Sequence, residues 1–135
     1  MEDFNYFIAD EIINACIAED NNKKKFTLSI PGGDTPSGVW PILLKDSYKS
    51  ILDRKIVHLF WNDERIVKKM DRENNFNQVF NSFLNNYEGI NTHRIKAWLD
   101  PKIMEKDYKK RLQRETKSVK SIPQLDLVFM GMGAD

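Results

Sequence analysis

The most informative stretch of the sequence is Val57-His58-Leu59-Phe60-Trp61-Asn62-Asp63-Glu64-Arg65. Its first part is apolar apart from one histidine, as in a strand that is buried on both faces of a parallel sheet. Its last part is charged, and the carboxyl end of such a strand opens into the crevice where α/β proteins bind ligands. The stretch therefore predicts a buried strand over residues 56–61 that leads into a candidate binding site.

Two other strand-like runs lead into comparable loops. Residues 26–30 run into Pro31-Gly32-Gly33-Asp34-Thr35-Pro36, and residues 125–130 run into Gly131-Met132-Gly133-Ala134-Asp135. Parallel strands end at the same edge of a sheet, so we expect the three loops to converge there. Convergence of three distant segments is stronger evidence for a site than any one of the motifs.

The hydrophobic pattern along the chain alternates between helical and strand periods. This alternation predicts an α/β fold, a three-layer parallel sheet with helices on both faces. In the last helix Ile103, Tyr108 and Leu112 are expected to face inward. The predicted helices cover residues 3–19, a segment from Pro36, 75–87 and 101–118, and the predicted strands cover 26–30, 56–61, 94–98 and 125–130.

Length and composition restrict the class of protein. The chain has 135 residues, 41% of them hydrophobic, and a net charge of +1 that offers nucleic acid no basic surface. No apolar run approaches the ~20 residues of a membrane helix, and acidic residues interrupt the start where a leader would be apolar. The single cysteine, Cys16, is expected in the core and is typical of a cytoplasmic protein. No linker is evident, so residues 1–135 are treated as one domain.

The diglycine loop has the composition of a phosphate site. Gly32 and Gly33 can turn successive amides into one concavity, the following helix adds its positive amino end, and Thr35 adds a hydroxyl. A plain tight turn remains the alternative for two adjacent glycines. Asp34 would repel a phosphate unless its carboxylate points away from it.

The Asp-Glu-Arg loop offers groups for a polar, anionic ligand. Asp63 could orient the ligand and Arg65 could bind its anionic group, whereas a salt-bridged loop is the alternative. Glu64 lies between them and should face the other way, in a structural role. His58 is expected to be a satisfied buried histidine, and it shows no metal-ligand spacing with His93 or Cys16.

The third loop is less informative. Gly131 and Gly133 predict a flexible turn, and Asp135 is a possible site residue. The sequence contains neither a Gly-x-Ser-x-Gly nucleophile elbow nor a phosphate loop that ends in Gly-Lys-Ser/Thr.

Several of these motifs, in this order and spacing, resemble 6-phosphogluconolactonase, a family whose wider fold is shared with glucosamine-6-phosphate deaminase. The deaminases have Asp-Glu-Tyr in the second motif, so Arg65 favours the lactonase branch. The motifs are Pro-Gly-Gly-Asp-Thr-Pro at 31–36, Phe-Trp-Asn-Asp-Glu-Arg at 60–65, Asn75, His93-Arg94, and Leu-Asp-Leu-Val-Phe-Met-Gly-Met-Gly-Ala-Asp at 125–135.

The resemblance implies hydrolysis of 6-phospho-D-glucono-1,5-lactone to 6-phosphogluconate in the pentose phosphate pathway, without metal or cofactor. It implies that Gly32, Gly33 and Thr35 cradle the phosphate and that Asp63 and Arg65 line the substrate pocket. The family has serine where this chain has Asp34, which leaves the contact of that loop with phosphate open.

The resemblance also bears on how much of the family's domain the chain contains. The family's general base is a histidine in Gly-Met-Gly-x-Asp-Gly-His, whose aspartate matches Asp135, so the histidine is expected beyond it. We therefore expect residues 1–135 to be a partial domain with a sheet that is incomplete at the carboxyl end. The resemblance also allows fusion of the parent polypeptide to glucose-6-phosphate dehydrogenase, an arrangement found in some members of the family. The alternatives are a deaminase/isomerase and a non-catalytic sugar-phosphate-binding domain.

Overall fold

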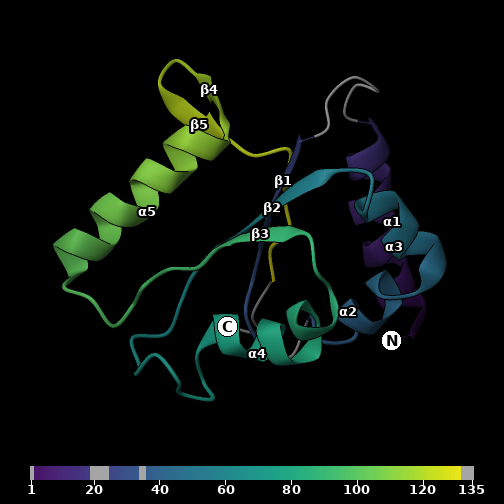
Figure 1. The fold of residues 1–135 in the computed structure, drawn as a ribbon, viewed down its shortest axis with the longest axis horizontal. Helices are drawn as coiled ribbons and strands as arrows, with labels where there is room; N and C mark the ends of the chain where they lie inside the picture. The colour runs from purple at the N-terminus through teal and green to yellow at the C-terminus, as the bar shows by residue number, and fades with distance from the viewer. Residues whose placement is uncertain (1, 19–24, 34–35, 132–135) are drawn as a thin grey trace.

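The computed structural model describes residues 2–18, 25–33 and 36–131, which form a mixed helix and sheet structure (Figure 1). Four parallel strands form the main sheet in the order β3-β2-β1-β6, and β4 and β5 form a separate antiparallel hairpin. The helices are α1 (Glu2–Ala18), α2 (Trp40–Leu43), α3 (Asp46–Leu52), α4 (Asn75–Ser82), the 3-10 turn η1 (Leu84–Asn86) and α5 (Pro101–Glu115). The strands are β1 (Lys25–Ile30), β2 (Ile56–Trp61), β3 (Ile90–His93), β4 (Lys117–Val119), β5 (Ile122–Gln124) and β6 (Leu127–Val128).

The two faces of the sheet differ in chemistry. Alternate residues of a strand point to opposite faces, and β1 pairs with β2 from Lys25↔Ile56 to Ile30↔Trp61. One face belongs to the hydrophobic core, and the other carries a mostly polar set of buried side chains. The core face bears Phe26, Leu28, Ile30, Val57, Leu59 and Trp61, whereas the second face bears Thr27, Ser29, His58, Phe60 and His93.

The hydrophobic core lies between the first face and the helices α1 to α4. Trp40 of α2 stacks on Phe83 with ring centres 5.5 Å apart, and Cys16 of α1 is fully buried as expected. Burial raises the pKa of the Cys16 thiol, which keeps it protonated and inert. From α1 the core takes Ala9, Ile12, Ile13 and Cys16.

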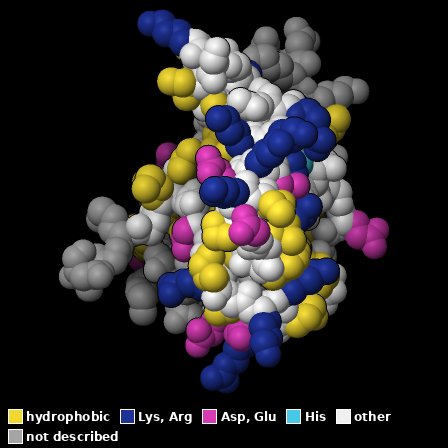
Figure 2. All heavy atoms as spheres, turned by 90° about the vertical axis from the view of Figure 1, so that its left-hand side faces the viewer, with side chains coloured by type: hydrophobic (Ala, Val, Ile, Leu, Met, Phe, Trp, Pro, Cys, Tyr) yellow, Lys and Arg dark blue, Asp and Glu magenta, His cyan; other side chains and the backbone are white. Residues whose placement is uncertain are grey.

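The second face is covered by α5, on the side of the sheet opposite α1 and α3 (Figure 1). The hydroxyl group of Tyr108 donates to the backbone carbonyl of Trp61 at 2.6 Å. The hydroxyl oxygen of Tyr108 also accepts from the backbone amide of Trp61 at 3.0 Å. The prediction of helices on both faces is therefore confirmed. The outer surface of α5 mixes basic, acidic and apolar side chains (Figure 2). Ile103, which was expected to face inward, is 58% exposed, whereas Tyr108 and Leu112 are partly buried.

Three local predictions were wrong. The third strand is Ile90–His93 rather than 94–98, because this edge strand exposes Asn91 and Thr92 and so has no apolar run. The helix expected from Pro36 consists of a turn and two short helices, α2 and α3. The last strand is confined to Leu127–Val128.

The β4–β5 hairpin was not predicted at all. Its turn residues, Lys120 and Ser121, have φ values of 49° and 66°. Such hairpin turns are usually recognised in a sequence by Asn-Gly or Asp-Gly, which adopt positive φ without strain.

Within the described residues, no helix has both the length and the apolar character needed to cross a membrane.

Candidate functional site

The carboxyl ends of β1, β2 and β6 meet around one side chain, that of Asn62. Its backbone amide donates to the Ile30 carbonyl at 2.9 Å, and its side-chain amide donates to the Phe129 carbonyl at 2.7 Å. The side-chain oxygen of Asn62, Oδ1, accepts from the Ser29 hydroxyl at 2.5 Å. Asn62 thus ties together the three segments that the sequence predicted to converge, although sequence reasoning gave it no role.

The diglycine turn fits its surroundings because it lacks side chains. A Cβ on Gly32 would lie 1.9 Å from Cγ of Asn75, so only glycine allows this approach. Gly33 has a φ of +85°, in the left-handed region that glycine adopts without strain. Its amide donates to Oε1 of Gln78 at 3.1 Å. Asp34 and Thr35, which complete the predicted phosphate site, lie outside the described residues.

Glu64 caps the amino end of α4. Its Oε1 accepts from the amides of Asn75 at 2.6 Å and Arg65 at 2.9 Å, and its Oε2 accepts from the Phe76 amide at 3.1 Å. The side chain of Asn74 accepts from the Asn77 amide at 3.1 Å and completes the cap. A carboxylate here also interacts favourably with the helix dipole. The structural role predicted for Glu64 is confirmed.

Asn75 connects the two predicted site loops. Its side-chain amide donates to Oδ2 of Asp63 at 3.1 Å and to the Asp63 carbonyl at 3.2 Å. Its other surface lies against Gly32, and the side chain is buried whereas Asp63 is exposed. Asn75 therefore holds Asp63 and the diglycine turn in fixed positions.

The Asp-Glu-Arg loop and the diglycine turn share one pocket of about 280 Å³. This volume is close to the lower end of the range of about 300–1,000 Å³ that is usual for small-molecule sites. The lining combines a guanidinium, a backbone turn, two carboxamides and one carboxylate, which suits a small polar or anionic ligand. The lining residues are Gly33, Arg65, Glu73, Asn75 and Gln78.

The third predicted loop begins next to the first. A Cβ built on Gly131 would lie 3.8 Å from Cβ of Pro31, so the two loops are in contact at this point. Gly133 and Asp135 lie outside the described residues. Glu73 and Gln78 were missed by the sequence analysis, and only their positions, just before α4 and in its first half, could have indicated them.

The two histidines form a pair on the second face of the sheet, away from the pocket. Nδ1 of His58 lies 2.9 Å from Nε2 of His93, and the rings are stacked. Burial lowers the pKa of both histidines, that of His93 to about 4. The charges of His58 and of nearby arginines also lower the pKa of His93. The prediction that His58 is a satisfied buried histidine is confirmed. In the described part of the chain, no cluster of His, Cys, Asp or Glu could hold a metal ion.

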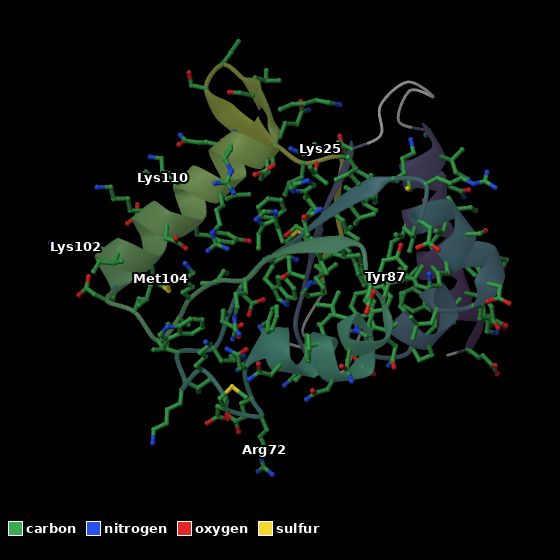
Figure 3. All side chains as sticks on the ribbon, viewed as in Figure 1. Lys25, Arg72, Tyr87, Lys102, Met104 and Lys110 are labelled. Carbon is green, nitrogen blue, oxygen red and sulfur yellow. The ribbon has the colours of Figure 1, made fainter. Side chains whose placement is uncertain are left out.

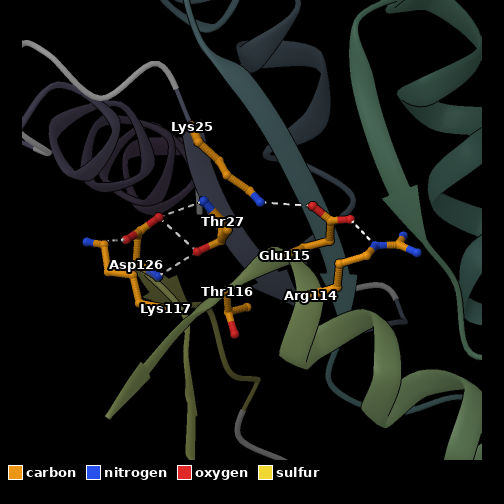
Figure 4. A pocket seen from close by; sticks show the side chains of 7 residues that line it. All are labelled: Lys25, Thr27, Arg114, Glu115, Thr116, Lys117 and Asp126. Carbon is orange, nitrogen blue, oxygen red and sulfur yellow. Dashed lines mark hydrogen bonds and ion pairs between the residues drawn. The ribbon is translucent and has the colours of Figure 1, made fainter.

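A second cavity, of about 200 Å³, lies at the amino end of β1 (Figure 4). Lys25 pairs with Glu115 at 2.9 Å, and hydrogen bonds from Lys25 and Arg114 lower the pKa of Glu115 to about 2. Asp126 accepts from the amide and the hydroxyl of Thr27, each at 2.8 Å. These charged groups attach the end of α5, and the residue that precedes β6, to β1.

Comparison with known proteins places this arrangement in a family. The chain is 30% identical over 110 residues to 6-phosphogluconolactonase of Aggregatibacter actinomycetemcomitans, a match that covers 80% of this chain and 46% of the relative. It is 31% identical over 138 residues to glucosamine-6-phosphate deaminase of Treponema denticola, with 99% of this chain and 49% of the relative covered.

A solved structure shows the same fold. The structure of 6-phosphogluconolactonase from Trypanosoma brucei matches with a TM-score of 0.83 at 19% identity, over 99% of this chain and 57% of that one. The chain spans about half the length of the relatives it matches. The model of the glucosamine-6-phosphate isomerase/6-phosphogluconolactonase family matches residues 2–135, and this chain belongs to that family.

Proposed function

We propose that this chain provides the substrate-binding part of an enzyme that hydrolyses 6-phospho-D-glucono-1,5-lactone to 6-phosphogluconate. The single observation that carries the proposal is that Gly33 and Arg65 line one pocket at the carboxyl edge of the sheet. A lactonase relative and the family match support the same reaction.

Each pocket group has a proposed role in holding the substrate. The guanidinium of Arg65 binds an anionic group of the substrate through paired hydrogen bonds. Gly32, Gly33 and Thr35 receive the phosphate, and the Gly33 amide becomes available when Gln78 releases it. Asp63, held by Asn75, accepts hydrogen bonds from sugar hydroxyls.

The chemical step needs a base that activates water for attack on the lactone carbonyl. Neither described histidine can act in this pocket, because both are buried on the second face of the sheet. As the family resemblance implies, we therefore assign the base to a histidine beyond Asp135, in continuation of the run that Gly131 begins. Water activated in this way suffices to open a lactone, so the proposed reaction uses neither metal nor cofactor.

The proposed setting is the pentose phosphate pathway in the cytoplasm. There the lactone is produced by oxidation of glucose 6-phosphate, and fusion of this chain to glucose-6-phosphate dehydrogenase would place the two steps on one polypeptide. Mass spectrometry of the native polypeptide tests that fusion.

The direct test is lactone hydrolysis by the full-length protein. The lactone is generated in situ, and acid release is followed against its spontaneous hydrolysis. Arg65→Ala is expected to lower kcat/KM by about 10- to 100-fold, because it removes a charge-assisted contact. Arg54→Ala, which removes an exposed arginine after α3, is the matched control and should leave the rate unchanged. Equal kinetics for Arg65→Ala and Arg54→Ala would contradict the proposal.

The rival function is deamination and isomerisation of glucosamine 6-phosphate. It is favoured by the match to the Treponema denticola deaminase, which covers 99% of this chain. Arg65 stands where those enzymes typically have tyrosine, which favours the lactonase. Release of ammonia from glucosamine 6-phosphate, without acceleration of lactone hydrolysis, would establish the rival instead.

A further inference from the structure

We propose that Arg94 is a positioning residue for the pocket. Arg94 lies outside the pocket lining, and its side chain fixes the amino end of α4 relative to the loop that contains Arg65. The inference rests on the proposed function, since it concerns the binding of the same substrate. Arg94 follows β3 directly and does not line the pocket.

The side chain of Arg94 joins two segments of the pocket wall. Its Nη2 donates to Oδ1 of Asn74 at 3.1 Å and to the Lys69 carbonyl at 3.4 Å. Asn74 caps α4, and Lys69 lies in the loop that leads from Arg65 to Asn74. One guanidinium thus fixes the loop relative to the helix.

The contact with Asn74 is transmitted directly to the pocket. Oδ1 of Asn74 also accepts from the Asn77 amide, so Arg94 and the first turn of α4 share this oxygen. The next residue, Asn75, lines the pocket, holds Asp63 and abuts Gly32. A shift of Asn74 would therefore move the groups that contact the substrate.

The surroundings of Arg94 favour a flat guanidinium over any other cation. Its central carbon lies 4.0 Å from the ring centre of Phe76 and 4.6 Å from that of Trp98. Arginine stacks on aromatic rings and keeps its donors in one plane, whereas lysine offers a compact ammonium. Burial lowers the pKa of Arg94 and Glu64 opposes this effect, but an arginine stays protonated.

The backbone of Arg94 is also held from the opposite side. Its carbonyl accepts from Nη2 of Arg111 at 2.8 Å, which attaches the residue to α5. Arg94 is thus fixed by α5 at its backbone and by two rings at its side chain. A group anchored in this way can hold a neighbouring loop in place.

The test compares Arg94→Ala with Arg72→Ala in the full-length protein. Arg72 belongs to the same loop, and its side chain points away from the molecule (Figure 3), so this control matches the loss of charge. Arg94→Ala is expected to lower kcat/KM by about tenfold or more, chiefly through KM, because misplacement of binding groups by about 1 Å has effects of this size. Millimolar guanidinium should restore part of the loss in Arg94→Ala and none in Arg72→Ala.

A second variant covers the case in which Arg94→Ala does not fold. Arg94→Lys keeps the charge but not the planar stacking, and it is expected to raise KM several-fold with little change in kcat. A KM equal to that of the unsubstituted protein in Arg94→Lys, or an Arg94→Ala variant that matches Arg72→Ala, would overturn the inference.

Amide hydrogen exchange separates this inference from the proposed function. The Asn77 amide should exchange faster in Arg94→Ala than in Arg72→Ala, whereas β1 amides should not change, whatever reaction the protein catalyses. If the unsubstituted protein hydrolyses no lactone, the proposed function fails, and the Asn77 exchange still decides whether Arg94 orders the start of α4. An unchanged exchange rate of the Asn77 amide in Arg94→Ala would contradict the positioning role of Arg94.

Discussion

Three consecutive residues, Asp63, Glu64 and Arg65, have unlike roles in this structure. Glu64 turns toward α4 and accepts three backbone amides, whereas Arg65 lines the pocket. Asp63 is exposed and accepts a hydrogen bond from the side-chain amide of Asn75. A charged triplet at the end of a strand can thus combine a helix cap with two groups for which we propose a role in substrate binding.

The capping role of Glu64 leads to a stability prediction. Glu64→Ala leaves the Asn75 and Phe76 amides without their acceptor, and a lost cap costs about 0.5–2 kcal/mol in free energy of unfolding. Urea unfolding at pH 7 measures the difference. Glu73→Ala removes an exposed carboxylate nearby and should change stability by less than about 0.5 kcal/mol. Equal stabilities for the two variants would contradict the assignment.

The two glycines of the turn are predicted to respond differently to alanine. Gly32→Ala places a Cβ within 1.9 Å of Asn75 Cγ, so Asn75 must move and the pocket must change shape. Gly33→Ala meets no atom within 4 Å and only strains a backbone with φ of +85°, at a cost of about 1–2 kcal/mol. Affinity for 6-phosphogluconate, measured by calorimetry, should therefore fall more in Gly32→Ala, although both variants are destabilised. An equal fall in affinity would contradict this prediction.

At the scale of elements, β2, β3 and α5 meet at the buried His58–His93 pair. Lys25 of β1 and Arg111 and Arg114 of α5 lie near enough to disfavour protonation of this pair, and among the charged groups of the described residues Glu115 favours it. Nδ1 of His58 lies 3.5 Å from Oε2 of Glu115. The contact between α5 and the sheet should therefore depend on the histidines staying neutral.

This arrangement predicts loss of stability in mild acid. The pKa of His93 is lowered by burial from 6.5 to about 4, so the unfolded chain binds more protons between these values. The free energy of unfolding is therefore unaffected by His93 above pH 6.5, where the histidine is neutral in both states. It falls as the pH drops toward 4, by up to about 3 kcal/mol. Urea unfolding from pH 7.5 to 5 should show this slope, and His93→Gln should flatten it. Glu115, with a pKa of about 2, acts at lower pH, between about 4.5 and 2.

The sequence predicted elements where side-chain pattern reflects burial. Alternate apolar residues of β1 and β2 lie on the core face of the sheet. The helical stripes match the core only in part, since Phe4 and Phe7 of α1 and Phe80 of α4 are exposed. β3 was misplaced because a polar edge strand lacks that pattern, and the β4–β5 hairpin was missed because Lys120 and Ser121 do not mark a turn. Parallel topology predicted that the loops converge. The amides of Asn62 and Asn75, which join the loops, give no signal in charge or hydropathy.

At the scale of the whole molecule, the two layers of helices are attached to the sheet by different forces. α1 contributes four buried residues to the hydrophobic core. None of the residues of α5, all of which the structure describes, is buried. Its attachment rests on polar contacts, chiefly Tyr108 with Trp61, Arg111 with Arg94, and Glu115 with Lys25.

This difference predicts that α5 opens before the core unfolds. Apolar burial contributes about 25 cal/mol per Å² removed from water, whereas exposed ion pairs contribute about 0–1 kcal/mol each, so α5 should have the lower opening free energy. Native-state hydrogen exchange should show α5 amides exchanging with a smaller free energy than α1 amides. Tyr108→Phe removes the hydroxyl shared with Trp61 and should speed exchange in α5 while leaving α1 unchanged. Equal exchange free energies in α1 and α5 would mean that the sheet and both layers unfold as one unit, contrary to this prediction.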